Sequence, residues 1–131
     1  MLDLCGFQVG RFFMAARAFD VFHFRYNAIH TGAERDIFPY LPHSDRAGTV
    51  AYTATSWRQL LNARKLQPGE KVPTAEDCYR FVLSRPEVDV CMTGPSNAAQ
   101  MTEALRALSQ GPMSEAELAW MRRVGAAKYG K

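Results

Sequence analysis

A short polar segment over residues 94–103 contains the residue types that bind phosphate groups in proteins. It presents a glycine, a hydroxyl and two amides, at Gly94, Ser96, Asn97 and Gln100, and a carboxylate follows at Glu103. A glycine lets the backbone approach a ligand closely. A helix that begins near Asn97 adds free backbone N–H groups and the positive end of its dipole. The segment alone fits either an anion-binding turn or a simple capped turn between a strand and a helix.

Three short apolar runs predict the strands that would position this segment. They cover residues 20–26, 48–54 and 88–93. In the first run Phe22, Phe24 and Tyr26 alternate with other side chains, which gives the strand one aromatic face. Because helical segments lie between or after these runs, we expect an α/β fold with parallel strands joined by crossovers. Three parallel strands alone leave two open sheet edges, which indicates part of a larger assembly.

Capping patterns predict three helices after the second strand, and a shorter one over residues 56–64. The expected capping pairs are Thr74 with Asp77, Asn97 with Gln100, and Ser114 with Glu117. The expected ends are Pro86, Gly111 and Gly130. The helical spacing predicts these buried faces: Cys78, Phe81 and Val82 in the first helix; Met101, Leu105 and Leu108 in the second; Leu118, Met121 and Val124 in the third.

The composition is that of an ordinary globular domain and excludes several functional classes. The 131 residues are 47% hydrophobic and 22% charged, and the net charge of +3 is too small to indicate a nucleic-acid partner. The three cysteines, Cys5, Cys78 and Cys91, have neither disulfide nor zinc spacing, so we expect free thiols and no metal. No run approaches the ~20 apolar residues of a membrane span, so we expect no membrane contact and a cytoplasmic protein. Residues 1–18 fit no element, and residues 19–131 form the α/β unit.

Three segments in order resemble the aldo/keto reductase family: DVFHFRYNAIH at residues 20–30, AYTATSW at 51–57 and MTGPSNAAQMTEAL at 92–105. They look like the sixth, seventh and eighth strands of that family's barrel. The resemblance implies a partial TIM (β/α)8 barrel, with three parallel strands, crossovers and C-terminal helices. The phosphate site of such barrels commonly lies at the loops after strands seven and eight.

The resemblance implies a nicotinamide dinucleotide, NADP(H), as the cofactor. Ser96 and Gln100 would hold the 2′-phosphate, and Tyr52 would stack under the nicotinamide ring. Thr53, Thr55 and Ser56 would follow the diphosphate. Gly94 and Glu103 complete the family pattern, but Ala104 replaces an asparagine that usually contacts adenine. His23 falls where the family often has a glutamine for the nicotinamide carboxamide. A core tyrosine at position 52 and a packed His23 remain as alternatives.

The family's chemistry is hydride transfer to a carbonyl, with a tyrosine as general acid assisted by lysine, aspartate and histidine. These four residues come from the first half of the barrel and match nothing here, so no catalytic residue is assigned. We therefore expect an NADP(H)-dependent oxidoreductase fragment that carries part of the cofactor site and requires a complementing N-terminal half. The alternatives are a non-catalytic NADPH-binding or sensing half-barrel that self-associates, and a remnant without function.

Overall fold

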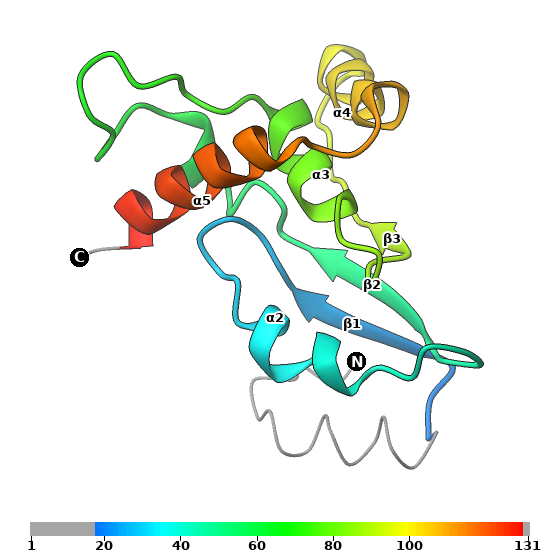
Figure 1. The fold of residues 1–131 in the computed structure, drawn as a ribbon. Coiled ribbons are helices and arrows are strands. Elements are labelled where there is room, and N and C mark those ends of the chain that lie inside the picture. The colour runs from blue at the N-terminus through cyan, green and yellow to red at the C-terminus, as the bar shows by residue number, and fades with distance from the viewer. Residues whose placement is uncertain (1–17, 130–131) are drawn as a thin grey trace.

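The computed structural model describes residues 18–129 (Figure 1). The expectations for residues 1–17 and for a helix end at Gly130 lie outside the described residues. The described chain forms a sheet of three parallel strands in the order β1 (Val21–Arg25), β2 (Gly48–Tyr52) and β3 (Val90–Cys91). The predicted α/β class and parallel strands are confirmed, although β3 is much shorter than the run over residues 88–93.

Helices fill the connections and the C-terminal part of the described chain. The helix α2 and the 3-10 helix η1 follow β1, the 3-10 helix η2 and α3 follow β2, and α4 and α5 follow β3 (Figure 1). Their bounds are α2 (Ala33–Asp36), η1 (Phe38–Tyr40), η2 (Gln59–Leu61), α3 (Ala75–Leu83), α4 (Ala98–Gln110) and α5 (Glu115–Tyr129). Figure 1 shows α3 lying between α4 and the sheet.

The aromatic face of β1 forms the centre of the core, as the alternation predicts. Phe22, Phe24 and Tyr26 are all buried. The Tyr26 ring stacks on Phe81 of α3 at 5.7 Å between centroids. It also meets Phe38 of η1 edge to face at 5.3 Å. One aromatic side chain thus joins the sheet to two helices, and such pairs add stability beyond their buried area.

The opposite face of the sheet is not buried within residues 18–129. Strand register places six side chains on it: Val21, His23 and Arg25 from β1, Val50 and Tyr52 from β2, and Val90 from β3. All six are half-buried or exposed. Val21 and Val90 are 50% and 51% exposed. We call these six residues the bare face of the sheet.

Two of the predicted capping boxes are confirmed. The Asp77 N–H donates to Thr74 Oγ1 at 3.1 Å, and the Thr74 N–H donates to an Asp77 carboxylate oxygen at 3.0 Å. Ser114 and Glu117 exchange the same pair of bonds at the start of α5. Arg80 of α3 binds Glu117 at 2.7 Å and fixes α5 against α3. This ion pair lowers the pKa of Glu117 to about 2.

The predicted buried face of α4 is wrong. Met101, Leu105 and Leu108 are 40%, 53% and 68% exposed, whereas Ala104 and Ala107 are buried. The helix α4 packs against α3. Alanine side chains let two helices approach closely, so the small residues turn inward and the large apolar stripe faces outward.

The predicted helix over residues 56–64 is also wrong. Ser56, Trp57 and Arg58 have left-handed backbone angles, with φ of 49°, 50° and 67°. L-residues in this conformation cannot continue a right-handed helix. Only the short 3-10 helix η2 remains of the predicted segment.

The helix α5 crosses the loop after β1 at very close range. A Cβ atom added at Gly125 would lie 1.8 Å from the carbonyl oxygen of Ala28. Gly125 is buried in the middle of α5, where glycine costs about 1 kcal/mol relative to alanine in helix propensity. Close packing therefore explains the glycine at this position, and it fixes the position of the β1 loop.

Candidate functional site

The residues expected to bind a cofactor follow the carboxyl ends of neighbouring parallel strands. Tyr52 ends β2, and Thr53 and Thr55 come directly after it. The Met92 N–H, just after β3, donates to the Ala51 carbonyl at 2.8 Å. The chain that leads to Gly94 therefore leaves the sheet beside the end of β2. In open and closed α/β sheets, ligands bind at this edge.

Tyr52 lies on the bare face of the sheet, not in the core. Its register partner on β1 is Arg25, and His23 pairs with Val50 in the same way. Tyr52 is half-buried and lines a pocket. His23 is half-buried on the same face. The sheet thus carries both residues on the same face.

The turn after Tyr52 holds two buried hydroxyl groups without hydrogen-bond partners among the described residues. These are Thr53 Oγ1 and Ser56 Oγ. Thr53 has a left-handed backbone, as Ser56 does, and each such residue costs on the order of 1–3 kcal/mol. The third hydroxyl, Thr55 Oγ1, accepts a long bond of 3.4 Å from the Arg58 N–H. A strained turn with unused hydroxyls is typical of a ligand-binding segment.

Asn27 connects this turn to the loop after β1. Its Nδ2 donates to the Thr53 carbonyl at 2.8 Å. Its Oδ1 accepts from the backbone N–H groups of Ile29 at 3.0 Å and His30 at 2.9 Å. The side chain is fully buried. We did not identify Asn27 from the sequence, although an asparagine directly after a strand is a known turn signal.

The segment over residues 94–103 is an open turn that leads into α4. Gly94 and Ser96 are exposed, and a Cβ atom at Gly94 would meet nothing within 4 Å. Asn97 caps α4, because its side chain accepts from the Gln100 N–H at 3.0 Å. The Gln100 side chain oxygen accepts from the Ser96 N–H at 2.8 Å, not from the Asn97 N–H as the expected capping box requires. This bond orients the Gln100 amide toward Ser96 and leaves its NH₂ group as a donor.

Glu103 contacts another part of the fold. One of its carboxylate oxygens accepts from the Ala75 N–H at 3.0 Å. This bond caps the first turn of α3, where a carboxylate is also favoured by the helix dipole. Glu103 therefore positions α4 relative to α3, and the next residue, Ala104, is buried between them.

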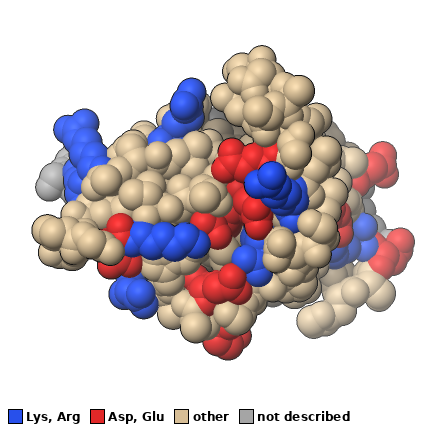
Figure 2. All heavy atoms as spheres, turned by 90° about the horizontal axis from the view of Figure 1, so that it is seen from above, with Lys and Arg blue, Asp and Glu red and all other residues tan. Residues whose placement is uncertain are grey.

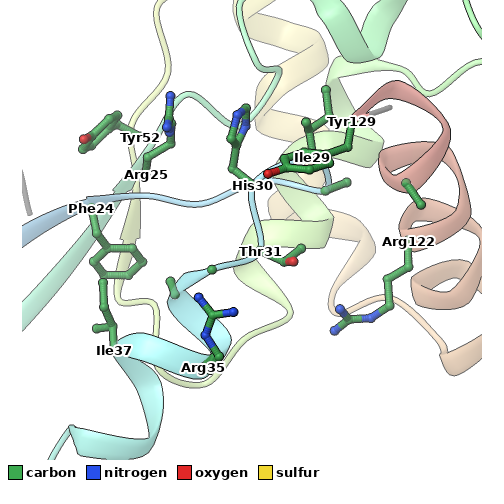
Figure 3. Close-up of a pocket in the computed structure, with 14 residues that line it drawn as sticks. Phe24, Arg25, Ile29, His30, Thr31, Arg35, Ile37, Tyr52, Arg122 and Tyr129 are labelled. Atoms are coloured by element: carbon green, nitrogen blue, oxygen red, sulfur yellow. The ribbon is translucent and has the colours of Figure 1, made fainter. Parts of the chain in front are cut away.

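A pocket of about 680 Å³ lies at the end of β1 (Figure 3). Its lining comes from the end of β1, the loop that follows, α2, Tyr52 and α5. Its lining contains no aspartate or glutamate. It contains three arginines and one histidine: Arg25, Arg35, Arg122 and His30. Sequence reasoning did not identify this pocket, because its arginines come from three separate elements.

Two of these arginines are neutralised within the described structure. Arg122 makes two hydrogen bonds to Glu34, at 2.9 and 3.0 Å, and Arg35 makes two to Asp36. Glu34 also accepts from Tyr26, whose burial raises the pKa of the phenol. Arg25 has no ion pair among residues 18–129, and its guanidinium instead lies 5.9 Å from the centroid of the Trp57 ring.

His30 adjoins Arg25 in the pocket wall. Its Nδ1 lies 3.2 Å from Asn27 Oδ1, which can only accept, so the proton is on Nδ1. Its ring meets Tyr129 edge to face. Burial, and then the charge of Arg25, lower the pKa of His30 below its usual value. Both effects favour the neutral form of His30, in which the contact with Asn27 leaves Nε2 as the acceptor.

Other chemistry is sparse in the described part of the chain. No group of three or more metal-ligating side chains occurs among residues 18–129. Burial raises the pKa of the Cys91 thiol to about 12 and that of Cys78 further, so neither is a reactive thiolate. No described helix could cross a membrane. Acidic and basic side chains are interspersed over the face seen in Figure 2.

No protein-family model matches this chain, and no curated protein matches it significantly.

Proposed function

We propose that this chain contributes part of the NADP(H) site of an aldo/keto reductase-like oxidoreductase, as the last three strands of a (β/α)8 barrel. One observation carries the proposal. Three parallel strands, adjacent in the sheet in their chain order, bring Tyr52, Thr53 and the turn at Gly94 to the same edge. This arrangement agrees with the order of the three segments that resemble the family.

In this proposal the turn after β3 holds the 2′-phosphate. Ser96 is exposed, and Gln100 is already oriented toward it by the bond to the Ser96 N–H. The turn precedes α4, a helix of 13 residues whose dipole favours an anion at this end. No arginine or lysine lies among residues 94–103, so the phosphate is held by hydrogen bonds and the helix end.

The turn after β2 would receive the diphosphate and the nicotinamide. In this proposal the turn opens on binding, so that the buried hydroxyls of Thr53 and Ser56, which lack partners among the described residues, donate to phosphate oxygens. Tyr52 offers its ring on the bare face, where a planar nicotinamide can stack. The bound cofactor supplies hydride to a carbonyl, and the proton donor would come from a complementing N-terminal half.

The phosphate turn is tested by comparing 2′,5′-ADP with 5′-AMP. We expect 2′,5′-ADP to bind the chain with a dissociation constant of roughly 0.1–1 mM and 5′-AMP to bind more weakly. Ser96→Ala and Gln100→Ala should each weaken 2′,5′-ADP binding by about tenfold, since hydrogen bonds to charged groups contribute about 1.5 kcal/mol or more. Calorimetric or NMR titration measures both ligands.

Ser109→Ala is the matched control, because this exposed serine lies at the other end of α4 and bonds only to a carbonyl of its own helix. It should bind 2′,5′-ADP as the unmodified chain does. Equal affinity of the folded chain for 2′,5′-ADP and 5′-AMP would leave residues 94–100 as an ordinary capped turn.

The bare face supports a second candidate function, a cofactor-binding half-barrel that self-associates without chemistry. Val21 and Val90 are half exposed on it, and exposed apolar sheet surface favours association. We expect sedimentation velocity to show concentration-dependent dimers or larger species. Val21→Lys and Val90→Lys should reduce their fraction severalfold.

The stripe on α4 provides the control for this experiment, because Leu108 is even more exposed than Val90. If Leu108→Lys disperses the oligomers and Val90→Lys does not, the contact lies on α4 and the bare-face assignment is wrong.

A further inference from the structure

We propose that the pocket at the end of β1 binds a small organic anion, and that the Arg25 guanidinium receives its carboxylate or phosphate group. The anion site follows from the pocket itself. Its use for a carbonyl substrate rests on the proposed function.

Arg25 is placed to meet a ligand at the bare face. It is exposed and paired in register with Tyr52, so the two side chains are neighbours on one face of the sheet. Figure 3 shows Arg25, Tyr52 and His30 on the side of β1 opposite to Phe24 and Ile37. Trp57 supports the guanidinium from another segment, which restrains its orientation while its N–H donors stay available.

The charge balance of the pocket selects an anion. The pocket lining contains no carboxylate, and the Arg35 and Arg122 charges are each matched by a bidentate acidic neighbour. Arg25 is the arginine of this lining without an ion pair among residues 18–129. An unmatched positive charge at the mouth of a cavity attracts anionic ligands. Burial, and then the charge of Arg25, lower the pKa of the neighbouring His30.

The shape of the pocket fits a small organic molecule. Its volume of about 680 Å³ lies within the usual range for ligand sites. Ile29 and the Tyr129 ring line it near His30 and offer apolar surface to a carbon chain. The planar fork of arginine binds a carboxylate or a phosphate through two parallel hydrogen bonds, which a point charge cannot do. We therefore expect a ligand with one anionic end and a short apolar body.

The neighbouring Tyr52 connects this ligand to the proposed chemistry. If the nicotinamide stacks on Tyr52, an anionic group held at Arg25 places the rest of the molecule beside that ring. The substrate class that fits is a short oxo acid or a phosphorylated carbonyl compound.

The test compares an anionic ligand with its neutral ester and with a second anion. Pyruvate and methyl pyruvate share the same oxo group, and inorganic phosphate supplies the alternative anionic end. We expect NMR titration of the chain to show pyruvate or phosphate binding at least about tenfold more tightly than methyl pyruvate. The signals of His30 and Tyr129 should shift.

Substitutions of Arg25 test whether this arginine binds the anion. Arg25→Gln should remove the preference for the anion, and Arg25→Lys should retain part of it, since lysine keeps the charge without the fork. Arg106→Gln on the exposed surface of α4 is the matched control and should bind like the unmodified chain. A preference for phosphate that depends on Arg25 identifies the anionic end as phosphate and supports the site.

The result separates this site from the phosphate turn. Arg25→Gln should bind 2′,5′-ADP normally if Ser96 and Gln100 hold the 2′-phosphate. If the unmodified chain shows no preference for 2′,5′-ADP over 5′-AMP, the phosphate turn is refuted, but an Arg25-dependent preference for pyruvate would still support the anion site. Equal binding of pyruvate and methyl pyruvate, or anion binding that needs Arg35 or Arg122 and not Arg25, would overturn the proposal.

Discussion

Gly125→Ala is expected to lower the free energy of unfolding by about 3 kcal/mol. Alanine normally stabilises a helix interior relative to glycine by about 1 kcal/mol. Here the added Cβ would lie 1.8 Å from Ala28 O and 2.4 Å from Ala28 C, which are backbone atoms that cannot rotate away. The helix α5 must move from the loop after β1, and this loop forms one wall of the pocket. Urea denaturation measures the loss.

Gly94→Ala is the matched control, because a Cβ there meets nothing within 4 Å and the backbone needs no positive φ. Its stability should stay within about 0.5 kcal/mol of the unmodified chain. A Gly125→Ala chain as stable as the unmodified one would show that α5 does not cross the loop at this distance. Arg122 and Tyr129, which line the pocket from α5, would then lie elsewhere.

Local signals in the sequence predicted the strands β1 and β2 and the helices α3, α4 and α5. The capping boxes at Thr74 and Ser114 are complete within four residues, so their hydrogen bonds depend little on the rest of the fold. The alternation in β1 identified the buried aromatic face for the same reason, since period two fixes which side chains share a face.

Packing between elements was not predictable in the same way. The spacing of Met101, Leu105 and Leu108 correctly indicates a helix, but the helix turns Ala104 toward α3. Which face is buried depends on the distance between the two helix axes, and periodicity does not contain that distance. The left-handed turn at Ser56 likewise lacks the glycine that usually signals such a backbone.

The same contrast between local sequence signals and packing holds for the residues of the candidate site. Tyr52, Ser96 and Gln100 are indicated by the family resemblance, and they stand at a strand end and at the start of a helix. The Arg25 pocket could not be predicted, because β1, α2 and α5 meet there only in the folded chain. A charged Arg25 between buried Phe24 and Tyr26 was the one available signal, since it placed a cation on the second face of the sheet.

Asn27→Ala is expected to have an effect as large as Gly125→Ala. The Asn27 side chain is fully buried and bonds to three backbone groups, at Ile29, His30 and Thr53. Alanine leaves the Ile29 N–H and the Thr53 carbonyl without this partner, and each unsatisfied buried group costs about 1–3 kcal/mol. We expect a total loss of about 3 kcal/mol by urea denaturation.

The functional consequence follows from which loop Asn27 holds. It anchors the turn after β2 at Thr53, directly after Tyr52, and none of its hydrogen bonds reaches the turn at Ser96. Asn27→Ala should therefore weaken NADPH binding more than 2′,5′-ADP binding under conditions where the variant remains folded.

Asn62→Ala is the control, because the exposed Asn62 amide also bridges backbone groups, at Arg58 and Arg64. It should cost less than about 1 kcal/mol and leave both ligands unaffected, since water replaces the lost partners. Equal weakening of both ligands by Asn27→Ala would mean that the loop after β1 supports the whole sheet edge, and that the turn at Thr53 has no separate role in holding the cofactor.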